Sequence, residues 1–389
     1  MQNGKPYILF CAGEDSGDCI GEGLVKQAVA ACDRLQTSFE IRGAGGIRMQ
    51  NAGMLPLVDF ETLPVSGFGD VLPKYFALRR SYKVLESALK SDLCAGLVAV
   101  DYPGFNMKLV AQAKKLNKPV LYVAPPQIWA WKSYRAKLFA GCSKIQLATF
   151  FDFEVEAYRL ANCNVVKTIH PFAQWTSALV AEPRLKKILL LPGSRKSQAL
   201  RNIPVFLKSA LSVVQDVQFS DFEIVILAAR KSLVSVFENA VLKATRSGNV
   251  SAGVCKKISV QEVPASTKER CRMYSSMAVS LSAPGTATLE LALSNCPTVV
   301  CTKPDFLTLQ MAKRFVKTEH FALPNLLLQK KIFPEYISRN FDSTMLAQVS
   351  DAIKKMTALK PSFSKEILEK LNSDYNSEKL MSEFLAQLV

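Results

Sequence analysis

The chain of 389 residues is poor in the residues that bind metal ions and carries no closely spaced cysteine pair. Its only histidines, His170 and His320, lie far apart in the sequence. Its ten cysteines are scattered, without a Cys-x-x-Cys motif, as is typical of small buried side chains in a reducing compartment. The composition therefore argues against a zinc site and against a disulfide framework.

Long apolar runs are also missing. No stretch reaches the ~20 apolar residues that a membrane-spanning helix needs. The first apolar stretch, 7–12, is followed by the acidic residues Glu14 and Asp15, and it is too short for the apolar part of a signal peptide. We therefore expect the protein to remain in the cytoplasm.

Acidic residues are outnumbered by basic ones, with 33 Asp and Glu against 49 Lys and Arg and a net charge of +16. Such a charge attracts nucleic acid, an anionic membrane surface or phosphorylated substrates. Alternatively, it reflects a generally basic solvated surface. No RRM, KH or zinc-knuckle signature accompanies it, so the sequence does not favour nucleic acid as a partner.

Three common catalytic motifs do not occur. Arg48 stands at the third glycine position of a G-x-G-x-x-G match that begins at Gly43. The chain has no G-x-x-x-x-G-K-[ST] phosphate loop and no G-x-S-x-G elbow. These absences argue against a P-loop enzyme and lower the case for a serine hydrolase.

The chain does contain a regular series of short apolar runs separated by amphipathic stretches. Continuous apolar runs of this kind predict parallel strands that helices cover on both faces. The predicted strands are 7–12, 39–42, 96–100, 120–123, 145–148, 187–191, 222–227, 277–281 and 298–301. A helix is predicted over 20–35.

The series of strands starts anew after a polar, proline-containing stretch at 182–185. We predict an α/β protein with two Rossmann-like, doubly wound parallel-sheet domains, 1–185 and 186–365, that face each other across a cleft. The last segment, 366–389, is predicted to form helices that could pack back onto the first domain.

Polar residues follow the strands of the first domain. Asp101 comes directly after 96–100, where a carboxylate can act as a general base or simply close the strand through an Asx-turn. Glu14, Ser16 and Asp18 follow the first strand, where they can contact a substrate or cap the next helix.

Two turns of the second domain are suited to phosphate. Gly285 and Thr286 precede a predicted helix whose free N–H groups can bind a diphosphate, and Glu290 lies one turn later, where it can accept from ribose hydroxyls. Arg195 follows another strand and can neutralise a phosphate. The alternatives are an ordinary helix cap and a surface arginine.

The sequence leaves two alternatives for the role of each of two features that contain aromatic residues. Trp129, like Trp131, is either part of the core or an apolar wall for a substrate. The segment 65–80 mixes apolar and basic residues, which fits an interfacial helix on an anionic membrane or a core helix with a basic outer face. Its candidate membrane-contacting residues are Phe68, Val71, Leu72 and Phe76.

Six stretches, in order along nearly the whole chain, resemble the lipid-A-disaccharide synthase family of bacterial glycosyltransferases. They are GEDSGD (13–18), DYPGFN (101–106), IWAW (128–131), LLPGSR (190–195), GTATLE (285–290) and LPNLL (323–327). Each is short, and their shared order makes the resemblance specific. The resemblance implies a GT-B fold, in which the first domain binds the acceptor and the second binds the UDP-sugar.

The implied reaction moves a 2,3-diacylglucosamine unit from its UDP donor to 2,3-diacylglucosamine 1-phosphate (lipid X), with inversion, to give a β-1,6-linked disaccharide 1-phosphate and UDP. The resemblance implies no metal and no cofactor. Carried over by motif, Arg195, Glu290 and Asn325 would hold UDP, together with Gly285 and Thr286. Asp101 would be the base, and the enzyme would sit peripherally on the inner leaflet of the inner membrane.

The chain departs from the family pattern at four positions, which are Gly104, Gln174, Gln198 and Pro284. The family commonly has Asp, Asp, Glu and Ser there. Two alternatives to the implied reaction remain. One is another GT-B enzyme that uses a UDP-sugar, such as a UDP-GlcNAc epimerase or a peptidoglycan transferase, and the other is a basic nucleic-acid-binding protein.

Overall fold

The computed structural model describes residues 4–63, 71–130, 132–173, 184–246, 253, 256–305 and 320–389, without the side chains of residues 71–75 and 245. The chain forms two compact units. Unit 1 comprises Met1–Pro171 and Leu371–Val389, and unit 2 comprises Phe172–Lys370. The chain therefore enters unit 2 once and returns to unit 1 at its C-terminal end.

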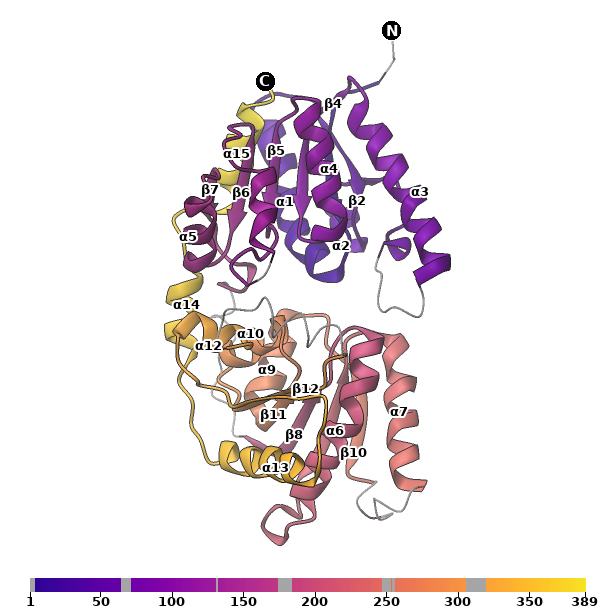
Figure 1. The fold of residues 1–389 in the computed structure, drawn as a ribbon, viewed down its shortest axis with the longest axis vertical. Coiled ribbons are helices and arrows are strands. Elements are labelled where there is room, and N and C mark those ends of the chain that lie inside the picture. The colour runs from indigo at the N-terminus through magenta and orange to yellow at the C-terminus, as the bar shows by residue number, and fades with distance from the viewer. Residues whose placement is uncertain are drawn as a thin grey trace. The chain divides into compact units, whose positions relative to one another are not determined.

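The described part of unit 1 contains one parallel sheet in the order β3-β2-β1-β4-β5-β6-β7. Its strands are β1 (Tyr7–Ala12), β2 (Glu40–Ala44), β3 (Leu55–Pro56), β4 (Cys94–Val100), β5 (Val120–Val123), β6 (Ile145–Thr149) and β7 (Val165–Lys167). Strands β1 and β4–β6 are apolar along nearly their whole length because helices cover both faces of the sheet (Figure 1).

Helices of unit 1 lie on the two faces of this sheet. They are α1 (Asp15–Arg34), α2 (Ile47–Asn51), α3 (Val71–Lys90), α4 (Pro103–Lys115), α5 (Asp152–Leu160) and α15 (Ser377–Ala386), with 3-10 turns η1 (Phe60–Thr62) and η3 (Ser133–Leu138). Helix α15 packs beside α1, and α3 packs beside α4. The C-terminal segment is thus built into unit 1.

Helix α1 begins at Asp15, five residues before the predicted start at residue 20. Glu14 occupies the N-cap with extended backbone angles, and Asp15 and Asp18 lie in the first turn. Acidic side chains stabilise the positive end of a helix dipole, so the polar residues before the predicted start form the first helical turn.

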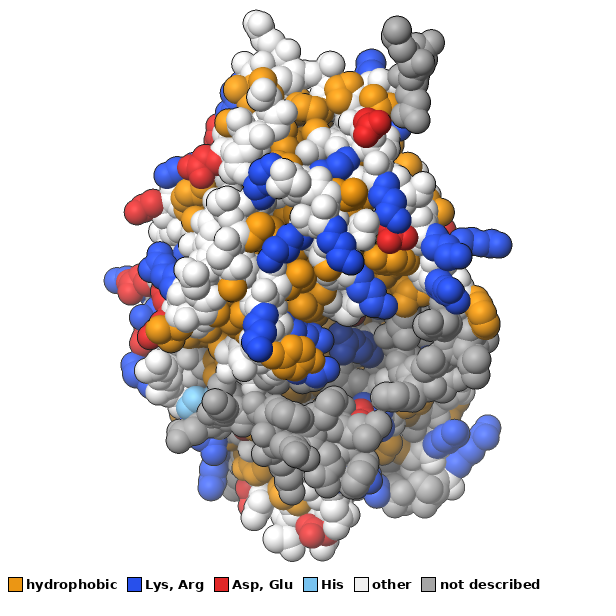
Figure 2. Space-filling view, turned by 45° about the horizontal axis from the view of Figure 1, so that its top comes forward, with side chains coloured by type: hydrophobic (Ala, Val, Ile, Leu, Met, Phe, Trp, Pro, Cys, Tyr) orange, Lys and Arg blue, Asp and Glu red, His pale blue; other side chains and the backbone are white. Residues whose placement is uncertain are grey.

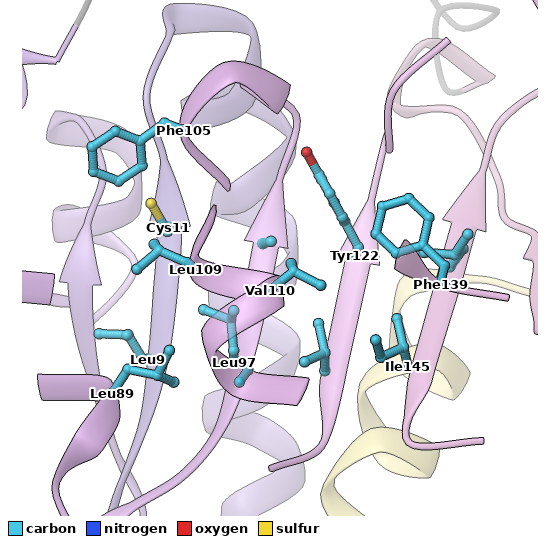
Figure 3. Close-up of a cluster of buried hydrophobic side chains, with 14 of the residues drawn as sticks. Leu9, Cys11, Leu89, Leu97, Phe105, Leu109, Val110, Tyr122, Phe139 and Ile145 are labelled. Carbon is cyan, nitrogen blue, oxygen red and sulfur yellow. The ribbon is translucent and has the colours of Figure 1, made fainter. Parts of the chain in front are cut away.

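The core of unit 1 is a cluster of apolar side chains between the sheet and its helices (Figure 3). Leu9, Leu97 and Ile145 project from three strands and are fully buried, as is Val110 from α4. Burying each such side chain contributes about 1.5–3 kcal/mol. This packing fixes the strand ends on which the polar residues sit.

The described part of unit 2 also contains a parallel sheet, in the order β10-β9-β8-β11-β12-β13. Its strands are β8 (Leu185–Leu191), β9 (Glu223–Ala228), β10 (Ile258–Glu262), β11 (Met277–Ser282), β12 (Thr298–Thr302) and β13 (Glu335–Ile337). Its helices are α6 (Lys196–Val214), η5 (Val217–Phe219), α7 (Lys231–Arg246), α9 (Thr267–Ser276), α10 (Thr286–Leu293), α12 (Leu323–Leu328) and α13 (Ser343–Thr357), and α14 (Ser364–Leu371) leads back to unit 1. The α/β prediction with two parallel sheets is confirmed.

In each unit the strand order reverses at one point, between β1 and β4 in unit 1 and between β8 and β11 in unit 2. At such a point the connections leave the two neighbouring strands toward opposite faces, and a crevice opens at their carboxyl ends. Ligands of open α/β sheets bind at these positions, so the topology directs attention to the residues that follow β1, β4, β8 and β11.

Candidate functional site

At the reversal point of unit 1, Ser16 and Asp101 meet. Ser16 lies in the first turn of α1, after β1, and Asp101 directly follows β4. The Ser16 hydroxyl donates to Asp101 Oδ2 over 3.1 Å. Two residues that the sequence predicted from separate motifs are therefore joined by a hydrogen bond, and this bond orients the Asp101 carboxylate.

The backbone at Asp101 is strained. Asp101 and Tyr102 both adopt left-handed angles, with φ of 50° and 51°. This conformation costs L-residues roughly 1–2 kcal/mol each, so the surroundings must hold it. The Asp101 N–H donates to the Val123 carbonyl at 2.9 Å, and the Tyr122 hydroxyl donates to the Asp101 carbonyl at 3.0 Å.

Tyr102 explains the glycine at the start of the first motif. A Cβ atom on Gly13 would lie 2.1 Å from Cδ1 of the Tyr102 ring, so only glycine allows the ring to pack there. The same ring stacks on Phe105 with a centroid distance of 5.6 Å, and its hydroxyl donates to the Leu63 carbonyl. The loops after β1 and β4 are thereby packed together.

Asp18 is buried, and its carboxylate binds backbone N–H groups of a neighbouring helix. Its two carboxylate oxygens accept from the backbone N–H groups of Arg48 and Met49, at 3.2 and 3.1 Å, in the first turn of α2. Burial raises the pKa of Asp18, and these backbone hydrogen bonds oppose the rise. Asp18 thus holds α2 against α1, and Glu14 occupies the N-cap position of α1.

Trp129 is half-buried, and a buried glutamate that the sequence analysis missed fixes its ring. The indole Nε1 donates to Glu154 Oε1 at 3.3 Å, and the ring packs edge-on against Phe153 at 4.8 Å. Burial raises the pKa of Glu154 from 4.5 to about 7, although the N–H groups of Phe150 and Trp129 favour its charged form. The available signal in the sequence was the position of Glu154 directly after the aromatic-rich run 150–153.

At the reversal point of unit 2 two turns lie side by side, because Ser282 of β11 is in register with Leu191 of β8. The Ala283 N–H continues this pairing by donating to the Leu191 carbonyl at 2.9 Å. The turn after β8 leads to Arg195, which is exposed at the N-cap of α6. The turn after β11 leads to Gly285 at the N-cap of α10.

Gly285 has φ of 155°, a backbone angle that residues with a side chain rarely adopt. A Cβ atom there would meet no atom within 4 Å among the described residues, which therefore leave open space in front of α10. The first N–H groups of a helix point outward into such space and attract anions. Gly285 and Thr286 therefore form a turn into which a phosphate can fit.

Glu290 lies one turn into α10 and is held by a buried arginine. Arg270 Nη2 lies 3.3 Å from Glu290 Oε1, and the two side chains are only 9% and 12% exposed. Burial raises the pKa of Glu290, while Arg270 and a hydrogen bond with Tyr274 lower it. The carboxylate is thus fixed in place below the Gly285 turn.

Asn325 differs from the other predicted UDP contacts because its side chain is fully buried and internally paired. Its Nδ2 donates to the Phe333 carbonyl at 2.8 Å and to Glu335 Oε1 at 2.9 Å, and its Oδ1 accepts from the Phe333 N–H. This amide holds the chain after α12 to β13, which leaves it no N–H for a nucleotide.

The candidate membrane segment is described in part. Phe68 lies outside the described residues, and the side chains of Val71 and Leu72, at the start of α3, do as well. Phe76 is 66% exposed. Arg79, Arg80 and Lys83 are also exposed, on the following turns of the same helix.

Comparison with known proteins agrees with these motifs. The family model described as lipid-A-disaccharide synthetase matches residues 8–383. The lipid-A-disaccharide synthase of Geobacter sulfurreducens is 31% identical over 89% of this chain and 87% of its own length. The enzyme of the same name from Trichlorobacter lovleyi is 32% identical over 89% and 88%.

The chain belongs to the lipid-A-disaccharide synthetase family. The resemblance seen in the six motifs is confirmed, and so is the predicted enzyme class, a glycosyltransferase of lipid A synthesis.

Solved structures with similar folds are far more distant in sequence. A Methanocaldococcus jannaschii UDP-GlcNAc 2-epimerase, solved with UDP-GlcNAc and UDP, matches 99% of this chain and 100% of its own with a TM-score of 0.58 and 10% identity. The glycotransferase of kitacinnamycin matches 99% of both chains with a TM-score of 0.57 and 10% identity. These likenesses show the fold and confirm the predicted GT-B class.

Three of the four departures from the family pattern lie in or beside the turns of the candidate sites. A Cβ on Gly104 would meet nothing within 4 Å among the described residues, so the family's aspartate would fit there. Gln198 packs over Gly193, whose hypothetical Cβ would lie 2.8 Å from Gln198 Oε1. Pro284 precedes the Gly285 turn, and Gln174, like Trp131, lies outside the described residues.

Within the described residues, no three His, Cys, Asp or Glu side chains gather as a metal site would require. Over the same part of the chain, no helix is both long and apolar enough to span a bilayer.

The raised pKa of Glu154 predicts a pH dependence of stability. A carboxyl whose pKa rises from 4.5 to about 7 on folding favours the folded state below pH 4.5 and loses that contribution as the pH rises through 7. As the pH rises from 4.5 to 8, the free energy of unfolding of Glu154→Gln should therefore increase by about 3 kcal/mol relative to that of the wild type, measured by urea unfolding.

The matched control is Glu156→Gln, on the exposed side of the same helix, where the carboxylate remains in water. Its stability should follow the wild type over the whole range. Parallel curves for Glu154→Gln and the wild type would show that Glu154 does not carry this pH dependence.

Proposed function

We propose that this chain transfers 2,3-diacylglucosamine from its UDP donor to the 6-hydroxyl of 2,3-diacylglucosamine 1-phosphate (lipid X), and releases UDP. Family membership supports the reaction. The observation that carries the residue assignment is that each sheet places its polar residues at its own reversal point. The epimerase alternative has support only from fold similarity at 10% identity.

Unit 2 binds the donor in this proposal. The diphosphate lies against the turn at Gly285 and Thr286, with Arg195 neutralising it from the neighbouring turn, because these two turns follow paired strands. Glu290, fixed by Arg270, accepts from the ribose hydroxyls. Charge develops on the leaving UDP in the transition state, and each preorganised donor there typically contributes about 3 kcal/mol. Asn325 supports the nearby fold and makes no contact with UDP.

Unit 1 binds the acceptor and supplies the base. Asp101, oriented by Ser16, takes the proton of the 6-hydroxyl as the oxygen attacks the anomeric carbon. The new bond joins that oxygen to the anomeric carbon, and the bond to the UDP oxygen breaks on the opposite face, so the configuration inverts. Trp129 lines the acceptor site as an apolar wall. Glu14 lies beside Ser16 and contacts the acceptor, whereas Asp18 acts through α2.

This assignment gives each unit half of the chemistry, and the transfer requires both halves to act on one pair of substrates. The base belongs to unit 1 and the leaving-group contacts to unit 2. Substitutions in unit 1 should consequently lower turnover, whereas substitutions in unit 2 should weaken UDP binding.

Asp101→Asn and Arg195→Ala form a matched pair for this test. Asp101→Asn keeps the shape of the side chain and removes the base, so turnover with UDP-2,3-diacylglucosamine and lipid X should fall ~10²-fold or more. Its affinity for UDP should stay near that of the wild type. Arg195→Ala should weaken UDP binding instead. Turnover is measured by mass spectrometry of the disaccharide 1-phosphate, and UDP binding by calorimetry.

A wild-type turnover rate in Asp101→Asn would remove Asp101 from the mechanism. Unchanged UDP affinity in Arg195→Ala would reject its phosphate contact.

We also propose that the protein works in the cytoplasm, bound peripherally to the inner leaflet of the inner membrane. The exposed face of α3 combines Phe76 with Arg79, Arg80 and Lys83. Figure 2 shows a face of the molecule on which Lys and Arg side chains are interspersed with apolar ones. An aromatic ring that enters the interface and basic side chains near anionic headgroups act together, at ~1 kcal/mol per basic residue.

The double variant Phe76→Ser, Arg80→Ser should bind vesicles of phosphatidylglycerol and phosphatidylethanolamine at least about tenfold more weakly, measured by co-sedimentation. Leu160→Ser is the control, because Leu160 is 83% exposed on α5, away from this face. Equal sedimentation of the α3 variant and the wild type would exclude α3 as the docking element.

A further inference from the structure

Asn106 is a fully buried amide directly behind Asp101. It lies in the first turn of α4, and its Nδ2 approaches three backbone carbonyl oxygens at the ends of β1 and β4. The acceptors are Cys11 at 3.0 Å, Val100 at 3.1 Å and Asp101 at 2.8 Å. One side chain therefore ties together the two strand ends that flank the reversal point of unit 1.

Within the described part of the chain, the oxygen of this amide, Asn106 Oδ1, is buried and lacks a hydrogen-bond partner. A buried acceptor without a partner is destabilising, so a smaller apolar residue would avoid that penalty if the position served packing alone. What the asparagine supplies is the donor group that faces the carbonyls.

The Asp101 carbonyl receives a second donor. The Tyr122 hydroxyl, which projects from β5, donates to the same oxygen at 3.0 Å. Burial raises the pKa of Tyr122 well above its usual range, so this hydroxyl keeps its proton. Two donors from two different elements thus hold the peptide plane that joins the left-handed residues Asp101 and Tyr102.

Holding that peptide plane sets the direction in which the Asp101 side chain leaves the backbone. In a relaxed backbone the carboxylate would move away from the Ser16 hydroxyl and from the acceptor oxygen. Reacting groups must be aligned within a fraction of an ångström, and a displacement of 1 Å can cost about 10²-fold in rate.

We propose that Asn106 and Tyr122 are positioning residues that hold the Asp101 carboxylate in its reactive direction through the Asp101 carbonyl. This inference rests on the proposed role of Asp101 as the base. Neither residue touches the substrate, so their loss should change the rate of the chemical step and leave substrate binding nearly intact.

The test compares Asn106→Ala, Tyr122→Phe, the double variant and Asp101→Asn in the full-length protein, with UDP-2,3-diacylglucosamine and lipid X as substrates. The control is Tyr7→Phe, which removes a hydrogen bond of 2.7 Å to the Ala88 carbonyl at the opposite end of β1. All rates are measured well below each variant's melting temperature, so that loss of stability does not enter the comparison.

Asn106→Ala should lower kcat by ~10²-fold with little change in either KM, and Tyr122→Phe should lower it less. The double variant should be hardly slower than Asn106→Ala, because both residues act on one carbonyl. Tyr7→Phe should retain wild-type kcat. Should Asn106→Ala fail to fold, Tyr122→Phe, which deletes a single atom, carries the test.

Two results separate this inference from the proposed function. If Asp101→Asn is inactive while Asn106→Ala and Tyr122→Phe turn over like Tyr7→Phe, the positioning role is overturned and Asp101 remains the base. If Asp101→Asn turns over like the wild type, the proposed base is wrong, and the positioning role fails with it.

Discussion

The structure depends on one constraint, the reversal of strand order within each parallel sheet. Strands β1 and β4 are neighbours, as are β8 and β11, and all point their carboxyl ends the same way as their partners. Strands that are far apart in sequence therefore end at the same edge of the sheet. For this reason Ser16, after β1, lies within hydrogen-bond distance of Asp101, after β4. The apolar interior of the strands makes this edge rigid, because helices bury both faces. The chemistry assigned to each unit follows from this edge.

Buried asparagines secure these edges in both units. Asn106 joins the ends of β1 and β4, and Asn202 of α6 plays a similar part in unit 2. The Asn202 Nδ2 donates to the Pro192 carbonyl at 2.7 Å, and its Oδ1 accepts from the Lys303 N–H at 2.8 Å. The Asn202 amide donates and accepts at once, whereas Asn106 acts through its donor group. Asn202 thus fixes the turn before Arg195 through the Pro192 carbonyl, as Asn106 fixes the backbone of Asp101 in unit 1.

Much of this arrangement could be predicted from the sequence, because long apolar strands and short motifs are local signals. The edge strands β3, β7, β10 and β13 were missed, because they are short or largely exposed and carry too weak an apolar pattern. Asp18 was expected to contact a substrate or to cap a helix, and Asn325 was expected to hold UDP. The hydrogen bonds of their side chains to the backbone of Met49 and Phe333 were not predicted. Glu154 and Asn106 were not singled out. Their roles depend on hydrogen-bond partners distant in sequence, which residue spacing does not reveal.

The central claim is that UDP binds at the reversal point of unit 2. Hydrogen–deuterium exchange of the wild-type protein with and without UDP tests it most directly. We expect slower exchange of the backbone amides at 194–196 and 285–288 when UDP is bound, because those N–H groups would border the diphosphate. Bound UDP that left both turns unprotected, and protected another part of the chain instead, would contradict the account.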